Sequence, residues 1–203
     1  MTTPQEVLDF WFGEIIDEWT ATDRYALWFG TRAADDELIR THFGDAIEQA
    51  VAGGMTAWEQ KPMDTLALII LLDQMTRVIG RGRAAAFAGD KRALSLCLAG
   101  ISSGFARQLP MVGQMFFYLP LEHSELLPHQ EKHLALYADM IRQCPARKKE
   151  LTAAFDYARK HMDIIARFGR FPHRNAALGR VNTPAEETYL QNTNESFGQG
   201  KGG

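Results

Sequence analysis

Apolar residues recur every three or four positions along most of the chain, and this spacing predicts amphipathic helices. The pattern is clearest in residues 35–52, where Leu38, Ile39, Phe43 and Ile47 fall on one helical face. The predicted helix over residues 65–79 is instead apolar on nearly every side through Leu72, which is typical of a helix at the centre of a core. No alternating segment of five or more residues predicts a strand. The pattern therefore predicts an all-α fold.

Cap and turn residues divide the chain into helices. Thr3–Glu6 and Thr183–Glu186 both have the capping-box sequence, in which a threonine precedes a glutamate by three positions. Pro120 is expected to end the helix before it. The short Gly/Pro turns predict stacked antiparallel helical hairpins, about 8 to 9 helices in all. The helices that we can bound from the sequence are 4–15, 36–52, 65–79, 83–98, 110–119, 124–143, 147–168 and 184–190.

The chain of 203 residues is long enough to bury one good core. We expect a single all-α domain over residues 1–190. Residues 191–203 are polar and glycine-rich, so we expect a disordered tail.

Composition limits the possible partners. The formal net charge is −3, so no overall attraction to nucleic acid or to an anionic membrane is expected. Cys97 and Cys144 match no metal or redox spacing, and reduced thiols are expected. The N-terminus has no secretory signal pattern, and the longest apolar run, Leu66–Leu72, is too short to cross a bilayer. These features predict a cytoplasmic protein in which any anion binding is local.

The segment Asp156–Arg180 has the strongest functional pattern. An apolar helix leads into a cluster of cations interleaved with Phe168, Phe171 and Pro172, which an ordinary surface loop does not need. Gly169 frees the backbone before the cluster, and a tight, ordered turn is expected there. The cluster consists of His161, Arg167, Arg170, His173, Arg174, Asn175 and Arg180.

A second group lies on the predicted central helix. Asp73 and Arg77 are four residues apart, so both face one side of the helix, with Gln74 beside them. Arg81 continues the row only if the helix passes through Gly80. One interpretation is a salt bridge where the buried helix emerges. The other is that Arg77 neutralises Asp73 and leaves Arg81 for an anion.

The sequence Pro120–Glu125, PLEHSE, places Glu122 and Glu125 on either side of His123. Two carboxylates beside an imidazole can make a general acid/base or a proton relay. In the alternative interpretation Ser124 caps the next helix and His123 only packs. His129 and His133 are spaced as a zinc pair could be, but no HExxH motif is present and no metal is expected. No nucleotide loop or flavin motif predicts a cofactor.

Two roles remain open for the cationic cluster. Arg170, His173 and Arg174 can close a structural latch on Asp73, Glu122 and Glu125, or they can hold an anionic ligand. Burying so many charges without compensation costs several kcal/mol per ion, so the cluster must be paired, partly hydrated or liganded.

Three blocks resemble a bacterial family catalogued as domain of unknown function 924. They are LDQMTRVIGRGRAAAF (72–87), FFYLPLEHSE (116–125) and YARKHMDIIARFGRFPHRNAALGR (157–180). VLDFWFG (7–13) and TPAEETYL (183–190) are similar to the two ends of that family. The resemblance therefore covers nearly the whole chain.

The resemblance implies a tetratricopeptide-like helical-hairpin fold, but no activity. Val78 departs from the family pattern, which has an amide there, and His129 and His133 lie outside it. The matching positions are Asp73, Gln74, Arg77, Arg81, Gly82, Phe87, Asp90, Pro120, His123, Glu125, Gln130, His161, Arg170, Phe171, Pro172, Arg174 and Asn175.

The leading hypothesis is a polar pocket for a small anionic molecule, with possible hydrolytic or acid/base chemistry. His123, Glu125 and His161 would be the catalytic groups. The ligand would be held by Asp73, Gln74, Arg77, Arg81, Gln130, Arg170, His173 and Arg174. The alternative is a non-enzymatic scaffold that binds a partner peptide. In it the polar cluster is a latch, and exposed Trp19 and Trp58 mark the partner surface.

Overall fold

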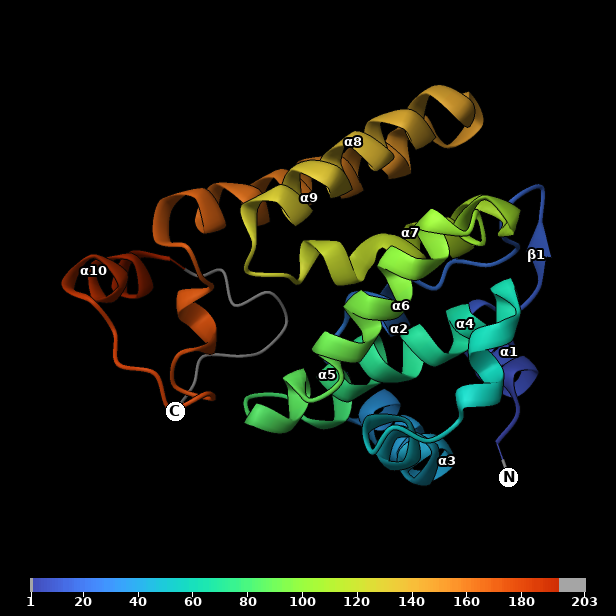
Figure 1. The fold of residues 1–203 in the computed structure, drawn as a ribbon, viewed down its shortest axis with the longest axis horizontal. Helices are drawn as coiled ribbons and strands as arrows, with labels where there is room; N and C mark the ends of the chain where they lie inside the picture. Colours follow the sequence, from blue (N-terminus) through green and yellow to red (C-terminus); the bar gives the residue numbers. More distant parts are fainter. Residues whose placement is uncertain (1, 194–203) are drawn as a thin grey trace. The chain divides into compact units, whose positions relative to one another are not determined.

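The computed structural model describes residues 2–193 (Figure 1), which divide into two compact units. The first comprises residues 2–81 and 85–120, and the second comprises residues 82–84 and 121–193. The label η marks a short 3-10 helix, except for η2, which is π-helical.

Helices make up nearly all of the regular structure in the described part of the chain. Residues 2–120 contain α1 (Pro4–Phe12), β1 (Ile15–Ile16), β2 (Trp19–Thr20), α2 (Tyr25–Phe29), α3 (Ala33–Val51), η1 (Thr56–Gln60), α4 (Pro62–Ile69), η2 (Ile70–Met75), α5 (Thr76–Ile79), η3 (Ala84–Phe87), α6 (Asp90–Ser102), η4 (Ala106–Gln108) and most of α7 (Met111–Glu122). Then follow α8 (Leu127–Gln143), η5 (Pro145–Arg147), α9 (Lys148–Phe168), η6 (Pro172–Arg174) and α10 (Pro184–Asn192).

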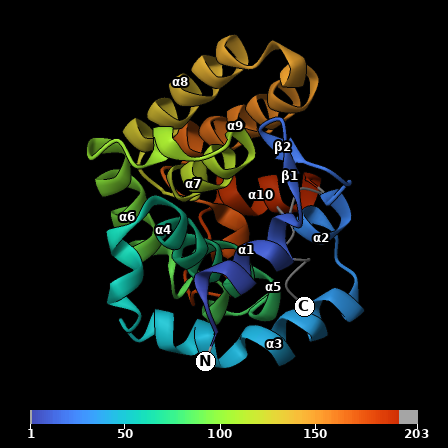
Figure 2. The same ribbon diagram turned by 90° about the vertical axis from the view of Figure 1, so that its right-hand side faces the viewer.

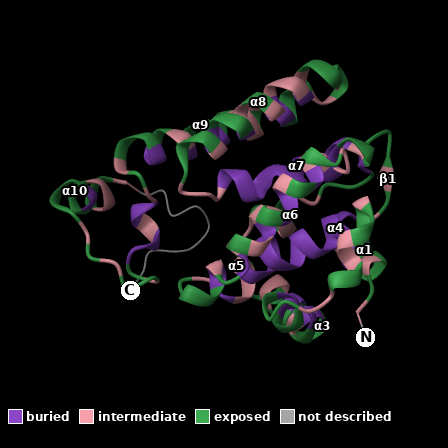
Figure 3. Ribbon diagram, in the orientation of Figure 1, coloured by how far each residue is buried: buried purple, intermediate pink, exposed green. Residues whose placement is uncertain are grey.

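The core of the first unit is built on the continuous helix α4–η2–α5. Every residue from Thr65 to Thr76 is buried, and up to Leu72 this is what the apolar pattern predicts (Figure 3). The π-helical turn lies in the middle of this buried stretch and includes Asp73 and Gln74. Such widened turns are frequent at functional sites.

Two backbone carbonyls at the widened turn accept hydrogen bonds from the side chains of residues four positions later in the sequence. Thr76 Oγ1 donates to the Leu72 carbonyl oxygen at 2.7 Å, and Arg77 Nη1 donates to the Asp73 carbonyl oxygen at 2.5 Å. Because a buried polar group without a partner costs about 1–3 kcal/mol, these bonds stabilise the π-helical turn.

A short hairpin at β1–β2 supports the start of α7. Asp17 and Glu18 form its two-residue turn, and both have positive φ values, 47° and 70°. Glu18 then bonds the first turn of α7: its carboxylate accepts from Met111 N–H at 2.9 Å and its carbonyl from Val112 N–H at 3.0 Å. A side chain in a strained turn therefore caps a helix far along the sequence.

The second unit contains the helical hairpin of α8 and α9, which lie side by side in both ribbon views (Figures 1 and 2). Helix α9 buries Leu151, Ala158, Ile164 and Ile165, and it ends at Gly169 with a φ of 69°. That left-handed conformation ends the helix and redirects the chain towards η6. A complete capping box at Thr183 and Glu186 then begins α10, as predicted.

The all-α prediction of about 8 to 9 helices is confirmed for residues 2–193, since α4, η2 and α5 form one helix. The finer prediction of a tetratricopeptide-like stack stays a prediction, as does the single domain over residues 1–190. In the predicted tail, residues 194–203 lie outside the described part of the chain. Within residues 2–193, no helix combines the length and apolar character needed to cross a membrane.

Three local predictions are wrong. Helix α7 continues through Pro120 to Glu122, because a proline this close to a helix end disturbs only its last turn. The predicted helix over residues 83–98 is instead η3 followed by α6, because Gly89 packs directly on the Leu72 carbonyl. Trp19 is not an exposed partner surface: it lies in β2 with 8% of its area exposed, and Trp58 is half-buried. Large aromatic rings stabilise the fold by leaving water.

Candidate functional site

The residues predicted on the central helix form an ion-pair cluster within the first unit. Asp73 is fully buried, and its carboxylate accepts a 2.6 Å hydrogen bond from the side chain of Gln74. Arg77 bridges two carboxylates: its Nη1 lies 3.3 Å from Asp73 Oδ1 and 2.9 Å from Asp90 Oδ1. Arg77 therefore neutralises Asp73, as one interpretation of the sequence expects.

Arg81 lies outside this row. Helix α5 ends at Ile79, and Arg81 Nη2 lies 3.3 Å from Asp36 Oδ1 of α3. The helix ends at Ile79, as its predicted range of 65–79 has it, because residue 80 already has the φ and ψ of a turn, so the row of Asp73 and Arg77 does not continue to Arg81. Asp36 is a partner that the i, i+4 spacing did not reveal.

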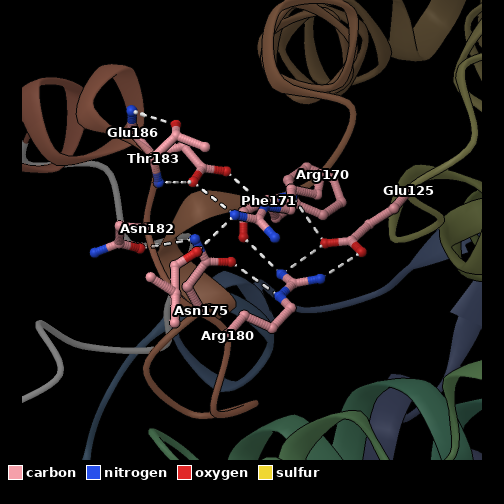
Figure 4. A network of polar contacts seen from close by, with 9 residues as sticks. Glu125, Arg170, Phe171, Asn175, Arg180, Asn182, Thr183 and Glu186 are labelled. Atoms are coloured by element: carbon pink, nitrogen blue, oxygen red, sulfur yellow. Dashed lines mark hydrogen bonds and ion pairs between the residues drawn. The ribbon is translucent and has the colours of Figure 1, made fainter.

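In the second unit, the cationic segment forms a structural network around two carboxylates (Figure 4). Arg170 contacts both oxygens of Glu186, at 2.6 and 2.7 Å, and donates to the Val181 carbonyl at 2.8 Å. The latch hypothesis from the sequence offered Asp73, Glu122 and Glu125 as the carboxylate partners of Arg170, His173 and Arg174. The actual partner is the capping-box glutamate of α10, which the fold brings back to η6.

Arg180 takes the position beside Glu125. Its Nη1 and Nη2 lie 2.7 and 3.0 Å from the two carboxylate oxygens, and Phe171 N–H donates to the same carboxylate at 2.8 Å (Figure 4). Arg180 also donates to Asn175 Oδ1 and to the Phe171 carbonyl. Asn175 in turn donates to Asn182 at 2.8 Å. These contacts fix the turn that connects α9 to α10.

Both carboxylates of the network are held in the ionised form. Burial acts to raise the pKa of Glu125, but the bonds from Arg180 and Phe171 N–H outweigh it and leave the pKa below its ordinary value. The Arg170 pair lowers the pKa of Glu186 to about 2. Carboxylates that stay ionised in this way suit a latch better than proton transfer.

A different cluster in the same unit has the groups for acid/base chemistry. Glu122, at the end of α7, lies 3.5 Å from His161 Nδ1 of α9 and 3.5 Å from His133 Nδ1 of α8. The three residues are nearly inaccessible, with exposures of 3%, 2% and 0%. We call Glu122, His133 and His161 the carboxylate–imidazole cluster. The predicted catalytic residue His161 is therefore in it, whereas Glu125 is not.

The hydrogen bond of His161 determines its tautomer. Nδ1 lies 3.2 Å from the Tyr157 carbonyl oxygen, which can only accept, so Nδ1 carries a proton. Burial lowers the pKa of His161 well below its ordinary value, and His123, His173 and Arg174 lower it further. The Tyr157 bond acts in the opposite direction and is outweighed. The ring is thus neutral near pH 7, with its lone pair on Nε2.

The other predicted residues of the second unit surround this cluster. The rings of His123 and His161 are 6.3 Å apart, and His123 is half-buried. Arg174 is 6% exposed and stacks 4.3 Å over the Phe171 ring, which also packs on half-buried His173. The structure therefore brings His123, His161, His173 and Arg174 together. That Asp73, Gln74, Arg77 and Arg81 line the same site stays a prediction.

Gln130 of α8 contacts the end of α7, where Glu122 of the cluster lies. Its Nε2 lies 3.3, 2.5 and 2.6 Å from the carbonyl oxygens of Leu121, Glu122 and Ser124, so it closes the end of α7. Its Oε1 is buried and has no hydrogen-bond partner among the described residues. A buried acceptor of this kind favours a bound donor group.

Sequence reasoning missed three pairings. It did not place His133 beside Glu122, Arg180 beside Glu125 or Glu186 beside Arg170. His133 pairs with a carboxylate rather than with His129, whose Nδ1 lies 2.8 Å from Ser124 Oγ. No group of three or more His, Cys, Asp or Glu side chains in the described part of the chain is arranged so that it could hold a metal ion. The repeated capping box was the one signal for Glu186, since it marks a glutamate with a fixed position.

The comparisons with known proteins give a family and a fold. Residues 7–194 match the model of a family described as "Bacterial protein of unknown function (DUF924)". The solved structure of protein of unknown function ATU0120 from Agrobacterium tumefaciens is similar, with 31% identity and a TM-score of 0.77 over 94% of this chain and 97% of that one. No curated protein matches the sequence. The chain is a member of the bacterial DUF924 family.

Proposed function

We propose that the protein binds a small anionic molecule at the carboxylate–imidazole cluster and that His161 acts on it as a general base. The observation that carries this proposal is the bond from His161 Nδ1 to the Tyr157 carbonyl. It leaves the lone pair on Nε2, in a ring that burial keeps neutral. A neutral imidazole with a carboxylate behind it activates water or removes an acidic proton.

In this proposal the negative charge of Glu122 stabilises the transition state. When Nε2 accepts a proton, the ring becomes an imidazolium, and the charge of Glu122 3.5 Å from Nδ1 stabilises it. The stabilisation is specific to the charged form, so it lowers a barrier rather than tightening ground-state binding. This arrangement supports hydrolysis or proton transfer.

Arg174 is the group that we assign to the anion. Its guanidinium carbon lies 4.3 Å from the centre of the Phe171 ring, and its charge is close enough to His161 to lower the pKa of that ring. Gln130 Oε1 offers a buried acceptor for a donor group of the ligand. The ligand would meet the cluster at the half-buried rings of His123 and His173.

A thermal-shift screen tests the proposal, because a ligand that binds the folded state raises the melting temperature. The screen uses inorganic phosphate and sets of phosphorylated and carboxylated metabolites. A hit should stabilise the wild type and Arg159→Ala, an exposed control on α9, but not Arg174→Ala or Arg174→Lys. Arg81→Ala tests the predicted contribution of the first unit. If no compound raises the melting temperature, or Arg174→Ala responds like the wild type, the proposal fails.

The scaffold alternative also has a supporting observation. The two ion pairs, Arg170–Glu186 and Arg180–Glu125, support a structural role for the cationic segment, although they differ from the expected pairing of Arg170, His173 and Arg174 with Asp73, Glu122 and Glu125. They leave Arg174 and the carboxylate–imidazole cluster unexplained. A scaffold needs no neutral buried base, so loss of a ligand response in His161→Gln together with Arg174→Ala would favour the small-molecule site.

A further inference from the structure

Ser124 and His129, neither of which takes part in the proposed function, form a hydrogen-bonded pair at the start of α8. Ser124 Oγ lies 2.8 Å from His129 Nδ1, and both side chains are half-buried. Oγ also accepts a 3.3 Å hydrogen bond from Leu126 N–H. That bond occupies one lone pair of Oγ, and the Oγ hydrogen has His129 Nδ1 as its acceptor. A serine hydroxyl that donates to an imidazole is the arrangement of a nucleophile beside its general base.

The backbone on both sides of Ser124 is held in place. Ser124 N–H donates to the Leu121 carbonyl oxygen at 3.2 Å, and the Ser124 carbonyl oxygen accepts a 2.6 Å hydrogen bond from Gln130 Nε2. The next residue, Glu125, is paired with Arg180 through both carboxylate oxygens. Because these contacts fix the serine relative to α8, Oγ and Nδ1 keep their separation without help from a ligand.

Two backbone amides next to this pair are able to stabilise an oxyanion. Within residues 2–193, Glu125 N–H and Leu127 N–H have no hydrogen-bond partner. They lie at the N-terminus of α8, a helix of 17 residues, where the aligned peptide dipoles produce a partial positive charge. Backbone N–H groups beside a nucleophile stabilise the negative oxygen of a tetrahedral intermediate.

The surroundings of the pair indicate a class of substrate. Leu126 is 58% exposed and Leu127 is 37% exposed, so two adjacent apolar side chains offer a surface to an apolar acyl chain. In the described part of the chain no carboxylate forms an ion pair with His129, so the imidazole lacks the third group of a triad. An alkoxide leaves more readily than an amine, and a base without that third group therefore favours an ester over a peptide.

We propose that Ser124 and His129 are a catalytic dyad that hydrolyses esters of apolar carboxylic acids. Ser124 Oγ attacks the carbonyl carbon of the ester while its proton passes to His129 Nδ1. As the bond from that carbon to the alcohol oxygen breaks, His129 gives the proton to the leaving alcohol and the acyl group stays on Oγ. Water then attacks the acyl group, His129 takes a proton from it, and Oγ recovers its hydrogen as the acid leaves. Water is the co-reactant, and nothing is oxidised or reduced.

Reaction with a fluorophosphonate tests the dyad without a known substrate. Oγ displaces fluoride from phosphorus, and mass spectrometry of peptides locates the adduct. The wild type should be labelled at Ser124 and not at Ser102, an exposed serine of α6. His129→Gln should slow labelling of Ser124 at least about 100-fold, because it removes the general base. His42→Gln, which replaces an exposed histidine on α3, should react at the wild-type rate.

A series of p-nitrophenyl esters with lengthening acyl chains tests the substrate class. For the wild type, kcat/KM should rise at least about tenfold from the acetate to the octanoate, because each added methylene leaves water. Leu126→Ser should remove most of this preference. Leu178→Ser, at a leucine of similar exposure to Leu127 in the same unit, should retain it.

Three results would overturn the proposal. The first is a folded wild type that is not labelled at Ser124, and the second is an equal labelling rate in the wild type and His129→Gln. The third is a kcat/KM that does not change along the ester series, which removes the apolar acyl class. The adduct and the ester series are measured on the wild type, so they decide even where a variant does not fold. His161 and Arg174 take no part in this reaction, so a failed metabolite screen leaves this inference standing.

Discussion

Arg180 and Glu125, which are 55 positions apart in the sequence, form an ion pair with two hydrogen bonds. Arg180 Nη1 and Nη2 each donate to one oxygen of the Glu125 carboxylate, at 2.7 and 3.0 Å. Both side chains are less than one-third exposed. The pair fixes the chain between α9 and α10 against the segment that precedes α8. This relationship makes the cationic segment part of the fold of the second unit.

Replacing Arg180 with alanine should therefore destabilise the protein by about 2 kcal/mol, the usual range for a hydrogen bond to a charged group. Glu125 would keep only the bond from Phe171 N–H. Urea denaturation at pH 7 measures the change. Arg159→Ala should change stability by less than about 0.5 kcal/mol, because its pair with Asp156 is exposed. Equal unfolding midpoints for Arg180→Ala and the wild type would remove the structural role.

Glu186 should make the protein sensitive to acid. Its pKa of about 2 in the folded state is below its ordinary value near 4.5, so its stabilisation is complete above pH 4.5. It is lost as the pH falls from 4.5 towards 2. Thermal melts over this window should show a shallower decline for Glu186→Gln than for the wild type. Exposed Glu187→Gln on the same helix should keep the wild-type slope; a slope unchanged in both variants contradicts the assignment.

His161 should produce a second pH effect. Because its folded-state pKa is well below the unfolded value near 6.5, the unfolded chain takes up a proton that the folded chain does not. Stability therefore falls as the pH drops below 6.5. His161→Gln should flatten the stability curve between pH 6.5 and about 5. The control is His42→Gln, because the His42 side chain is exposed on α3. A curve of unchanged slope in His161→Gln would contradict the lowered pKa of this ring.

Two glycines should respond to alanine in opposite directions. Gly44 is inside α3 with nothing within 4 Å of an added Cβ, so Gly44→Ala should stabilise the protein by about 0.5–1 kcal/mol. At Gly89 the same Cβ would lie 2.1 Å from the Leu72 carbonyl oxygen, which is backbone and cannot move alone. Gly89→Ala should cost at least about 2 kcal/mol. Melting temperatures of the two variants provide the comparison, and stabilisation by both would contradict the close packing at Gly89.

The helices were predictable because their signals are local. The capping boxes at Thr3 and Thr183 define helix starts through contacts three residues apart, and both are present as expected. The all-round apolar stretch likewise became the buried helix α4–η2–α5. The π-helical turn within it has no such signature, because it depends on bonds from Thr76 and Arg77 and on the packing of Gly89.

The candidate site was predictable only in its residue types. The sequence indicated the acidic and cationic groups of the second unit, and His161 and Arg174 do lie together there. The pairing was not predictable, because it depends on which residues tertiary structure places within 3 Å. Glu125 and Arg180 are 55 positions apart and Arg170 and Glu186 are 16 apart, and neither spacing follows a helical or strand period.

The π-helical turn also determines where the length of the chain can change. Each residue of an α-helix turns the following side chains by about 100°. A widened turn takes up one extra residue, so deletion of one residue from Ile70–Met75 would leave ordinary α-helix and keep the residues after it near their present orientation. The same deletion in α4 would rotate everything after it by about 100°, so that Arg77 would leave Asp90 and Gly89 would lose its fit against Leu72. A single deletion can therefore be accommodated at the widened turn but not in the α-helical part of this buried helix.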